Sequence, residues 1–443
     1  MSALHRQFLA LAIPNILANL VVPVAGLVDM GLLGHLDATG PVAGVVLGTL
    51  IFDYLYWSFG FLRMGTTSQV ARSLGAGDDT ETVRHLLRGL LFAVLLGVLM
   101  ILCQGLIAGG AFALLAGDET VQRYGRDYFF ARIHGAPATL GVYVLTGWFL
   151  GMGQARRALV LSIVLNGANI LLSWIFIYVL HMEARGAGLA TALSAWTALI
   201  TGLLLTGKSG PELRAACTQL LVKKPLLDML SLNMNLMIRT FALISAFSLF
   251  TNLSTAFGRE TLVGNTMLLR VLGFAAWFLD GFAFALESLA GRFHGAGDRP
   301  AIRRSLILCT WWSLATAILF AGLFFWFDRP LLELLNKHPA MLHQALLRVP
   351  ELILLLLLGS LAYTLDGLFI GFGEGRLIRN RMVLAFVIGF APPAWLAIHW
   401  HWDQFLWFAL IGFMAMRVLT LAEPLRHHQI FYIGDTSRNP TNP

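Results

Sequence analysis

The stretch SQVARSLGAGDDTETVR at residues 68–84 recurs as SLAGRFHGAGDRPAIRR at residues 288–304. In both copies an arginine precedes a Gly-Ala-Gly-Asp turn and a second arginine follows it, and matching positions are 220 residues apart. A second pair, GWFLGMGQAR at 147–156 and GLFIGFGEGR at 367–376, has the same offset. Self-similarity at a fixed spacing indicates that the chain contains two copies of one structural unit.

The composition is typical of an integral membrane protein. Of the 443 residues, 57% are hydrophobic and only 12% are charged, with a mean hydropathy of +0.73. A soluble globular protein has about 25% charged residues. A membrane-spanning helix needs roughly 20 mostly apolar residues, and such runs cover nearly the whole chain. We predict an all-α membrane protein with twelve spans, at residues 8–36, 42–74, 86–116, 124–153, 158–181, 186–207, 226–256, 262–293, 303–327, 341–373, 380–399 and 405–424.

The repeat and the spans together predict two lobes. Each copy contains six spans, and an even number returns the chain to the same side of the membrane, so the two lobes should be related by an axis along the membrane normal. We expect an N-terminal six-helix lobe at 1–207, a cytoplasmic linker at 208–225, and a C-terminal six-helix lobe with a short cytoplasmic tail at 226–443. Two such pseudo-symmetric bundles suit alternating access, which makes transport the leading function class.

Positive charge gathers in the breaks on one side of the predicted spans. Arg72 and Arg84 flank the first glycine turn, and Arg292 and Arg304 flank the second. The positive-inside rule therefore places both termini in the cytoplasm. Topology and anionic lipid headgroups account for the net charge of +7, so no nucleic-acid partner is expected. The three cysteines have no metal-type spacing, and we expect no metal, cofactor or disulfide framework.

Several charged residues fall inside the predicted spans, and they do not recur at the offset of 220. The counterpart of Asp29 is Leu249, and that of Asp366 is Thr146. A coupling site in one lobe would produce this asymmetry, and divergence after duplication would produce it as well. Asp280 and Glu287 are seven residues apart and so share a helix face. Either a buried ion-paired network or a second ion site fits the set Asp53, Arg63, Arg239, Arg270, Asp280, Glu287 and Asp366.

Asp29 is the most informative of these residues. It lies about 10 Å from the end of the first span. A charged carboxylate on the lipid face at that depth is unfavourable by on the order of 2–3 kcal/mol, so we expect Asp29 to face the protein interior or a wet cavity. Burial favours its protonated form, as a proton-coupled carrier requires. The alternative is a structural acceptor that never titrates. Pro14 should kink the same helix, either as a moving bend or as a static one.

Three stretches resemble the multidrug and toxic compound extrusion (MATE) family, in its bacterial DinF branch. They are LALAIPNILANLVVPVAGLVDMGLLGHLD at 9–37, FLRMGTTSQ at 61–69 and FLDGFAFALESLAG at 278–291. The resemblance implies a multi-pass protein of the bacterial inner membrane that exports cationic or amphipathic toxic compounds in exchange for H⁺ or Na⁺. It also implies that Asp29 is the coupling carboxylate and that Pro14 marks the bend of the first helix.

The resemblance extends to the fifth and sixth spans, with one departure. Asn169 and Thr191 match the family's polar network, but Ser173 stands where an aspartate is usual. A hard cation prefers several oxygen ligands and more than one negative charge, so the departure favours H⁺ over Na⁺. We expect the protein to act as a monomer on small molecules.

Two other function classes compete with efflux. A flippase for a lipid or a lipid-linked head group would have the same two lobes, and a strongly cationic cavity would favour it. A membrane enzyme ranks third, because the sequence has no HExxH motif, no GxSxG motif and no paired histidines at metal spacing within the spans.

Overall fold

The computed structural model describes residues 3–34, 39–115 and 118–427, and the regular structure of this part of the chain is helical. The N-terminal bundle contains α1 (Ala3–Gly34), α2 (Thr39–Ser58), α3 (Phe61–Gly75), α4 (Asp79–Leu102), α5 (Gln104–Leu114), α6 (Glu119–Arg132), η1 (Ile133–Gly135), α7 (Ala136–Gly151), α8 (Ala155–Trp174), η2 (Ile175–Val179) and α9 (Glu183–Thr206). The C-terminal bundle contains α11 (Lys223–Ser254), η3 (Thr255–Phe257), α12 (Arg259–Gly295), α13 (Arg299–Glu333), α14 (Pro339–Leu346), α15 (Val349–Phe372), α16 (Gly375–Leu384), η4 (Ala385–Phe390), α17 (Ala391–Trp400), α18 (Gln404–Ala422) and α19 (Pro424–His427). Between the bundles lies α10 (Gly210–Cys217).

The helices agree with the predicted spans. Among the described residues, 11 helical segments are long and apolar enough to cross a membrane. The remaining predicted span, 124–153, is formed by α6 and α7, which the single 3₁₀ turn η1 joins into one continuous path. Two other predicted spans are interrupted: 42–74 breaks after Ser58, and 86–116 breaks at Cys103. The predicted fold class, a twelve-span all-α membrane protein in two bundles, is therefore confirmed.

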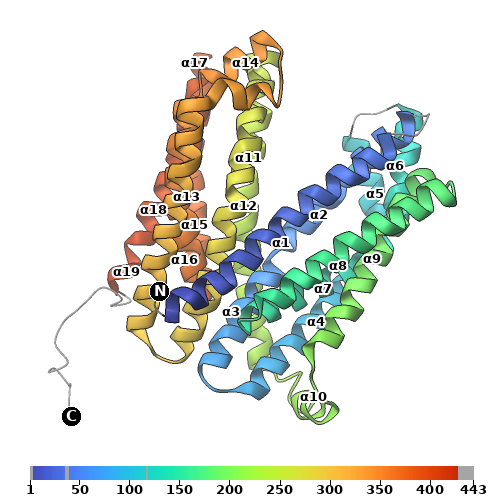
Figure 1. Ribbon diagram of the computed structural model, residues 1–443, viewed down its shortest axis with the longest axis vertical. Coiled ribbons are helices and arrows are strands. Elements are labelled where there is room, and N and C mark those ends of the chain that lie inside the picture. The colour runs from blue at the N-terminus through green and yellow to red at the C-terminus, as the bar shows by residue number, and fades with distance from the viewer. Residues whose placement is uncertain (1–2, 35–38, 116–117, 428–443) are drawn as a thin grey trace.

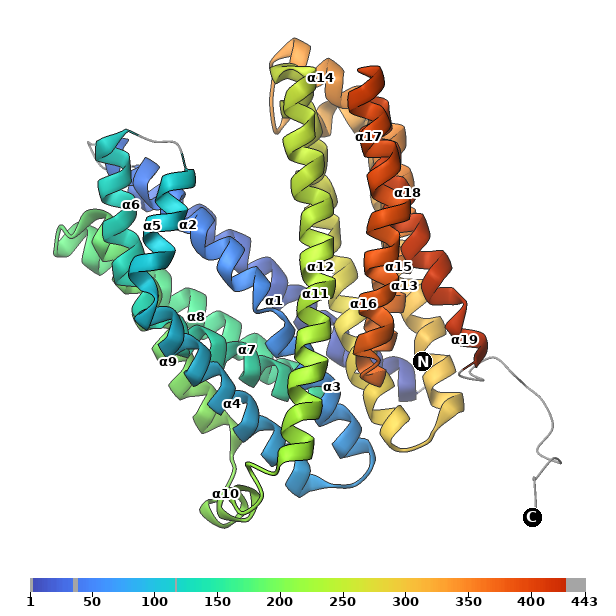
Figure 2. The ribbon, with the colours of Figure 1, turned by 180° about the vertical axis from the view of Figure 1, so that it is seen from behind.

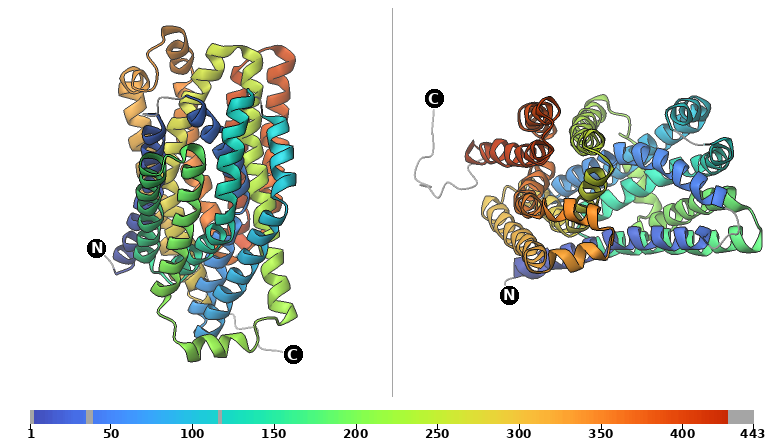
Figure 3. Two further views of the ribbon diagram at one scale, coloured as in Figure 1. Left: turned by 90° about the vertical axis from the view of Figure 1, so that its right-hand side faces the viewer. Right: turned by 90° about the horizontal axis from the view of Figure 1, so that it is seen from above.

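The two bundles meet at one end and diverge toward the other, as Figure 1 and the reverse view in Figure 2 both show. We call the end where they meet, defined by residues 72–78 and 292–298, the convergent end. Viewed from above in Figure 3, the bundles lie beside each other, and α1 runs from beneath the C-terminal bundle into the N-terminal one. The bundles thus share a narrow region of contact.

Equivalent glycines of the two repeats make the contact at the convergent end. A Cβ atom at Gly75 would overlap the backbone carbonyl of Arg292, and one at Gly295 would overlap that of Arg72. The two contacts are equivalent, because Gly295 and Arg292 lie 220 positions after Gly75 and Arg72. The backbones can approach so closely only because neither position carries a side chain. The local pseudo-twofold relation predicted from the repeat is thus present in the packing.

Two equivalent serines form similar contacts one or two turns further into the bundles, with acceptors that differ by one position from the exact repeat. The Ser68 hydroxyl donates to the Gly371 carbonyl at 3.3 Å, and the Ser288 hydroxyl donates to the Leu150 carbonyl at 2.6 Å. Both hydrogen bonds are buried and cross from one bundle to the other. Small residues and backbone carbonyls, rather than large side chains, therefore form the centre of the interface.

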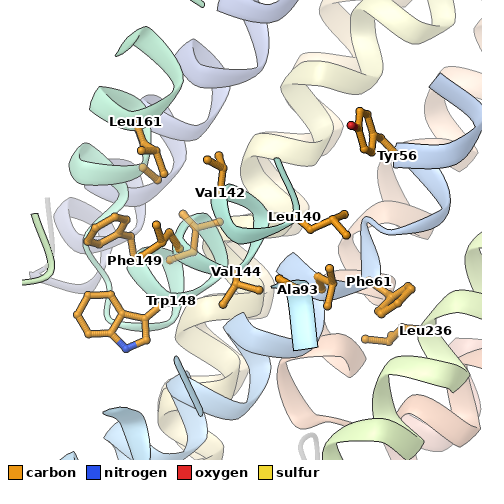
Figure 4. Packing of buried hydrophobic residues seen from close by; sticks show 14 of the residues in the cluster. Tyr56, Phe61, Ala93, Leu140, Val142, Val144, Trp148, Phe149, Leu161 and Leu236 are labelled. Carbon is orange, nitrogen blue, oxygen red and sulfur yellow. The ribbon is translucent and has the colours of Figure 1, made fainter. Parts of the chain in front are cut away.

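Apolar packing also continues across the interface. One cluster of buried side chains includes residues of both bundles, such as Phe61 of α3 with Leu236 of α11, and Phe8 of α1 with Phe282 of α12. Figure 4 shows part of this cluster, including Trp148 and Phe149 of α7. A second cluster lies wholly within the C-terminal bundle, around Trp407. The interface of the two bundles therefore contains a packed apolar core.

The segment that joins the bundles is docked onto the N-terminal bundle. Arg88 of α4, of which 2% is exposed, donates to the backbone carbonyls of Gln219 and Leu220 at 3.1 and 2.9 Å, and it also pairs with Glu81. A capping box between Ser209 and Glu212 begins α10. The connection is therefore anchored by a buried guanidinium group.

We predict that Gly75→Ala destabilises the protein by about 1–3 kcal/mol, because the added methyl group meets a backbone carbonyl that moves only if the bundles separate. Thermal unfolding of the purified protein in detergent measures the effect. Gly105→Ala is the matched control, since a Cβ atom there meets open space. Equal melting temperatures for the two variants would contradict this account of the interface.

Arg88→Met should release the connecting segment, because methionine keeps most of the volume and removes the donors that hold Gln219 and Leu220. We expect faster tryptic cleavage at Lys208, Arg214 and Lys223 in limited proteolysis. Arg84→Met is the control, since Arg84 lies on the same helix and also pairs with Glu81, at 3.0 Å, but donates no described hydrogen bond to the connecting segment. Unchanged cleavage in Arg88→Met would show that other contacts anchor the segment.

Candidate functional site

A polar pair joins α8 and α9 inside the N-terminal bundle. The side-chain amide of Asn169 donates to the Thr191 hydroxyl at 3.1 Å, and that hydroxyl donates to the Ala187 carbonyl at 2.9 Å. Ser173, one turn further along α8, is 1% exposed. The structure thus brings together two of the predicted site residues and buries the third one turn away.

The equivalent positions of the C-terminal bundle carry no polar side chain. The residues 220 positions after Asn169 and Thr191 are Gly389 and Ile411. A Cβ atom at Gly389 of η4 would meet the Gly412 carbonyl of α18, and one at Gly412 would meet the Gly389 carbonyl. The backbones of η4 and α18 are therefore in direct contact at this point. The amide–hydroxyl pair therefore belongs to one bundle.

Asp29 lies in α1 by its backbone, but its side chain is outside the part of the structure that is described. Hydrogen bonds on both sides of it fix the path of the helix: Ser162 donates to the Ala18 carbonyl at 3.2 Å, and Tyr178 donates to the Leu32 carbonyl at 2.6 Å. Ser162 lies on α8, and Tyr178 lies on η2, which continues it. The part of α1 that contains Asp29 therefore runs along the helix that bears Asn169.

The first half of α1 packs against the opposite bundle. The Asn19 amide donates to the Trp277 carbonyl at 3.0 Å, and the Phe8 ring stacks on Phe282 at 6.3 Å between centroids. Gly281 of α12 leaves no room for a Cβ atom beside Ile16. Pro14 lies in this half, and α1 continues through it and through Pro23 as one helix. A single helix therefore contacts both bundles.

The C-terminal bundle holds a buried ion-pair network around Asp366 of α15. One oxygen of Asp366 accepts hydrogen bonds from both Arg239 of α11 and Arg417 of α18. The three residues are 2%, 4% and 0% exposed, respectively. Such bonds between charged groups are the strong ones, and the burial of two guanidinium groups requires them. Asp366 thus ties three helices of its own bundle together.

Three further charges border this network. Arg63 of α3 pairs with Glu287 of α12 at 3.6 Å, across the interface of the bundles, and lies 3.7 Å from the centroid of the Phe284 ring. Asp280 is half-buried and interacts electrostatically with Arg63 and Arg239. Three arginines and three acids therefore balance near the centre of the molecule.

The remaining predicted charges lie elsewhere. Asp53 is exposed and interacts electrostatically with Arg132, whereas Arg63 pairs with Glu287. Arg270 is exposed, and no ion pair of it is described. The second arginine that pairs with Asp366 is instead Arg417. Sequence reasoning missed Arg417, although its position inside an apolar run was a usable signal.

These features define a class of protein. Two repeated helical bundles that meet at one end, with polar and charged groups buried inside them, form the architecture of a secondary membrane transporter. Within the described residues, no group of three or more histidine, cysteine, aspartate or glutamate side chains could hold a metal ion.

Comparison with known proteins identifies the family. The MatE family model matches residues 14–175 and 236–395, two segments that end 220 residues apart. DNA damage-inducible protein F of Escherichia coli (strain K12) is 34% identical over 433 residues, which cover 94% of this chain and 91% of that protein. The probable multidrug resistance protein NorM of a Synechococcus strain is 27% identical over 68% of this chain and 66% of its own. The chain therefore belongs to the MATE family of multidrug efflux transporters.

Solved structures agree with this fold. An outward-facing multidrug resistance MATE family transporter of the MOP superfamily matches with a TM-score of 0.87 at 19% identity, over 97% of both chains. A mutant of the Vibrio cholerae MATE transporter VcmN matches with a TM-score of 0.85 at 20% identity, over 97% of this chain and 98% of that one. The predicted family resemblance is confirmed.

We predict that Asp366→Asn destabilises the fold by about 3–5 kcal/mol, because it leaves Arg239 and Arg417 buried without a carboxylate. The melting temperature in detergent reports this loss. Asp53→Asn is the control and should unfold like the wild-type protein, since Asp53 is exposed and has no described ion pair. If Asp366→Asn were as stable as this control, the network would not be structural.

Proposed function

We propose that this protein is a proton-coupled antiporter that exports cationic or amphipathic compounds by alternating access between its two bundles. Asp29 carries the proton, Asn169, Ser173 and Thr191 shape its polar pocket, and Pro14 supplies the bend of α1. The observation that supports this proposal most directly is the partly buried Asn169–Thr191 hydrogen bond, which joins α9 to α8, the helix that runs along α1. This hydrogen bond has no polar counterpart in the other bundle.

The helix α1 is the physical link between proton binding and movement. Its second half runs along α8, and its first half packs against Trp277, Gly281 and Phe282 of α12. Protonation of Asp29 removes a negative charge from the α1–α8 region and exchanges its hydrogen bonds. Because Pro14 lacks a backbone N–H, the first half of α1 tilts at low free-energy cost and changes its contact with α12.

The proposal assigns coupling to the N-terminal bundle alone. In the C-terminal bundle, Asp366 already accepts hydrogen bonds from two arginines, so bound guanidinium groups occupy the place of a mobile cation. A lone carboxylate with amide and hydroxyl neighbours is a poor cage for Na⁺ and a good acceptor for a proton. The single-carboxylate pocket therefore favours H⁺ as the coupling ion.

Alternating access follows from the shape of the interface. The bundles at 1–207 and 226–443 move as units around the convergent end, which lies on the cytoplasmic side by the positive-inside rule. In the described arrangement this end is packed, and the bundles diverge toward the opposite side. Substrate release to the outside uses this arrangement, and separation of the glycine contacts opens the cytoplasmic side.

Asp29→Asn should abolish efflux driven by a pH gradient, because the amide mimics the protonated state and takes up no proton. The measurement is efflux of a cationic dye from proteoliposomes with an imposed pH gradient. Asp127→Asn, at an exposed carboxylate on α6, is the matched control and should transport normally. The Asp29 variant should still bind the dye, since its pocket keeps its shape.

Three outcomes would contradict the proposal. Normal efflux by Asp29→Asn would remove that residue from coupling. Wild-type efflux driven by a Na⁺ gradient alone would exclude H⁺ as the coupling ion. Transfer of labelled lipid between leaflets without any dye movement would identify the protein as a flippase.

A further inference from the structure

A cationic cavity opens between α11 and α16, near the convergent end of the C-terminal bundle. It has a volume of about 380 Å³ and is lined by Ser231, Met234, Asn235, Arg376 and Arg379. The helices α11 and α16 pack against each other, and Figure 2 shows them side by side. None of the residues in this cavity belongs to the coupling pocket or to the Asp366 network.

The two arginines of the cavity lack a carboxylate partner among the described residues. Arg379 is held in place by uncharged groups, donating to the side-chain oxygens of Asn235 at 2.8 Å and Asn380 at 2.8 and 3.0 Å. Arg376 is exposed, and no hydrogen bond or ion pair of it is described. Asp228 lies on α11 one turn before Ser231, but it forms no described ion pair with either arginine. The cavity therefore presents two positive charges, one of them fixed by the neutral side chain of Asn235, which is 5% exposed.

Exposed apolar side chains continue from the cavity along both helices. On α11, Met234 is 53% exposed and Phe241, seven residues later, is 45% exposed. Beyond Arg379, Val383 is 39% exposed, and Val387 in η4 is 55% exposed. Spacings of three, four and seven residues place these side chains on the same helix faces as the cavity residues. A cationic site thus lies at the base of an exposed apolar strip.

We propose that this cavity binds the phosphate of an anionic phospholipid, whose acyl chains lie along Met234, Phe241, Val383 and Val387. Guanidinium groups match phosphate oxygens in a bidentate geometry, and Ser231 and Asn235 add polar groups at the cavity wall. Basic pockets between membrane helices on the cytoplasmic side bind such headgroups. The apolar strip distinguishes a lipid from free phosphate, because only the lipid buries that surface.

Native mass spectrometry of the detergent-purified protein, with phosphatidylglycerol or phosphatidylcholine added, tests the proposal. Wild-type protein should retain phosphatidylglycerol in preference to phosphatidylcholine. Each arginine removed should weaken retention of phosphatidylglycerol about fivefold, in Arg376→Gln and in the double variant Arg376→Gln/Arg379→Gln. Arg381→Gln is the matched control: it removes the same charge from the same helix, where Arg381 pairs with Glu423 at 2.6 Å, and it should retain lipid normally.

Arg376→Gln keeps the test valid even if the double variant fails to fold, because Arg376 has no described partner to lose. Equal retention of phosphatidylglycerol by Arg376→Gln, wild type and Arg381→Gln would overturn the site. Displacement of the lipid by millimolar inorganic phosphate would overturn the lipid assignment in favour of a free anion. The readout is binding alone, so failure of this inference and failure of proton-coupled efflux are separate results.

Discussion

The two bundles can meet only because equivalent helix ends carry no side chain where they touch. Gly75 lies against the Arg292 carbonyl, and Gly295 lies against the Arg72 carbonyl. Membrane helices gain little from apolar burial against each other, because lipid is equally apolar, so close backbone approach and interhelical hydrogen bonds hold them together. The serine hydroxyls at 68 and 288 supply two such bonds across the interface. The divergence of the bundles, and with it the geometry for the proposed alternating access, depends on this small region.

On this symmetric scaffold the charged groups are asymmetric. Glu287 corresponds to Thr67 and Arg417 corresponds to Thr197 at the offset of 220, so the charges that pair with Arg63 and Asp366 have uncharged equivalents. Glycines and turn residues recur because both bundles need the same close approach. The charged and polar groups inside the two bundles differ. One fixes its carboxylate with two arginines, and the other keeps a neutral amide–hydroxyl pair beside α1.

Two further elements bridge the bundles, in addition to the contacts that α3 and α7 make with the C-terminal bundle. The first is α1, which contacts α8 of its own bundle and α12 of the other. The second is the segment around α10, which Arg88 holds against α4. Because Arg88 anchors it to α4, the segment is docked on the N-terminal bundle before the chain enters α11. In the proposed alternating access, these are the elements that connect proton binding to a change in the angle between the bundles.

The sequence by itself determined the class, the number of spans, the two-bundle repeat and the family. These properties depend on local hydropathy and on residue identity at a fixed offset, and both can be read without knowing which helices touch. The sequence also identified Asn169 and Thr191 as members of one polar network. It identified Arg239 and Asp366 as members of one set of charged residues within the spans. The breaks after Ser58 and at Cys103 were missed, because hydropathy stays high through them.

Only the tertiary structure decided which charges meet. Arg63 pairs with Glu287 of the other bundle, and Arg417 rather than Arg270 lies beside Asp366. These pairings depend on the rotation and tilt of each helix about its axis. The packing of whole helices sets this rotation and tilt. For example, α1 packs closely on α12 because Gly281 has no side chain where Ile16 lies. No local sequence pattern specifies such a contact.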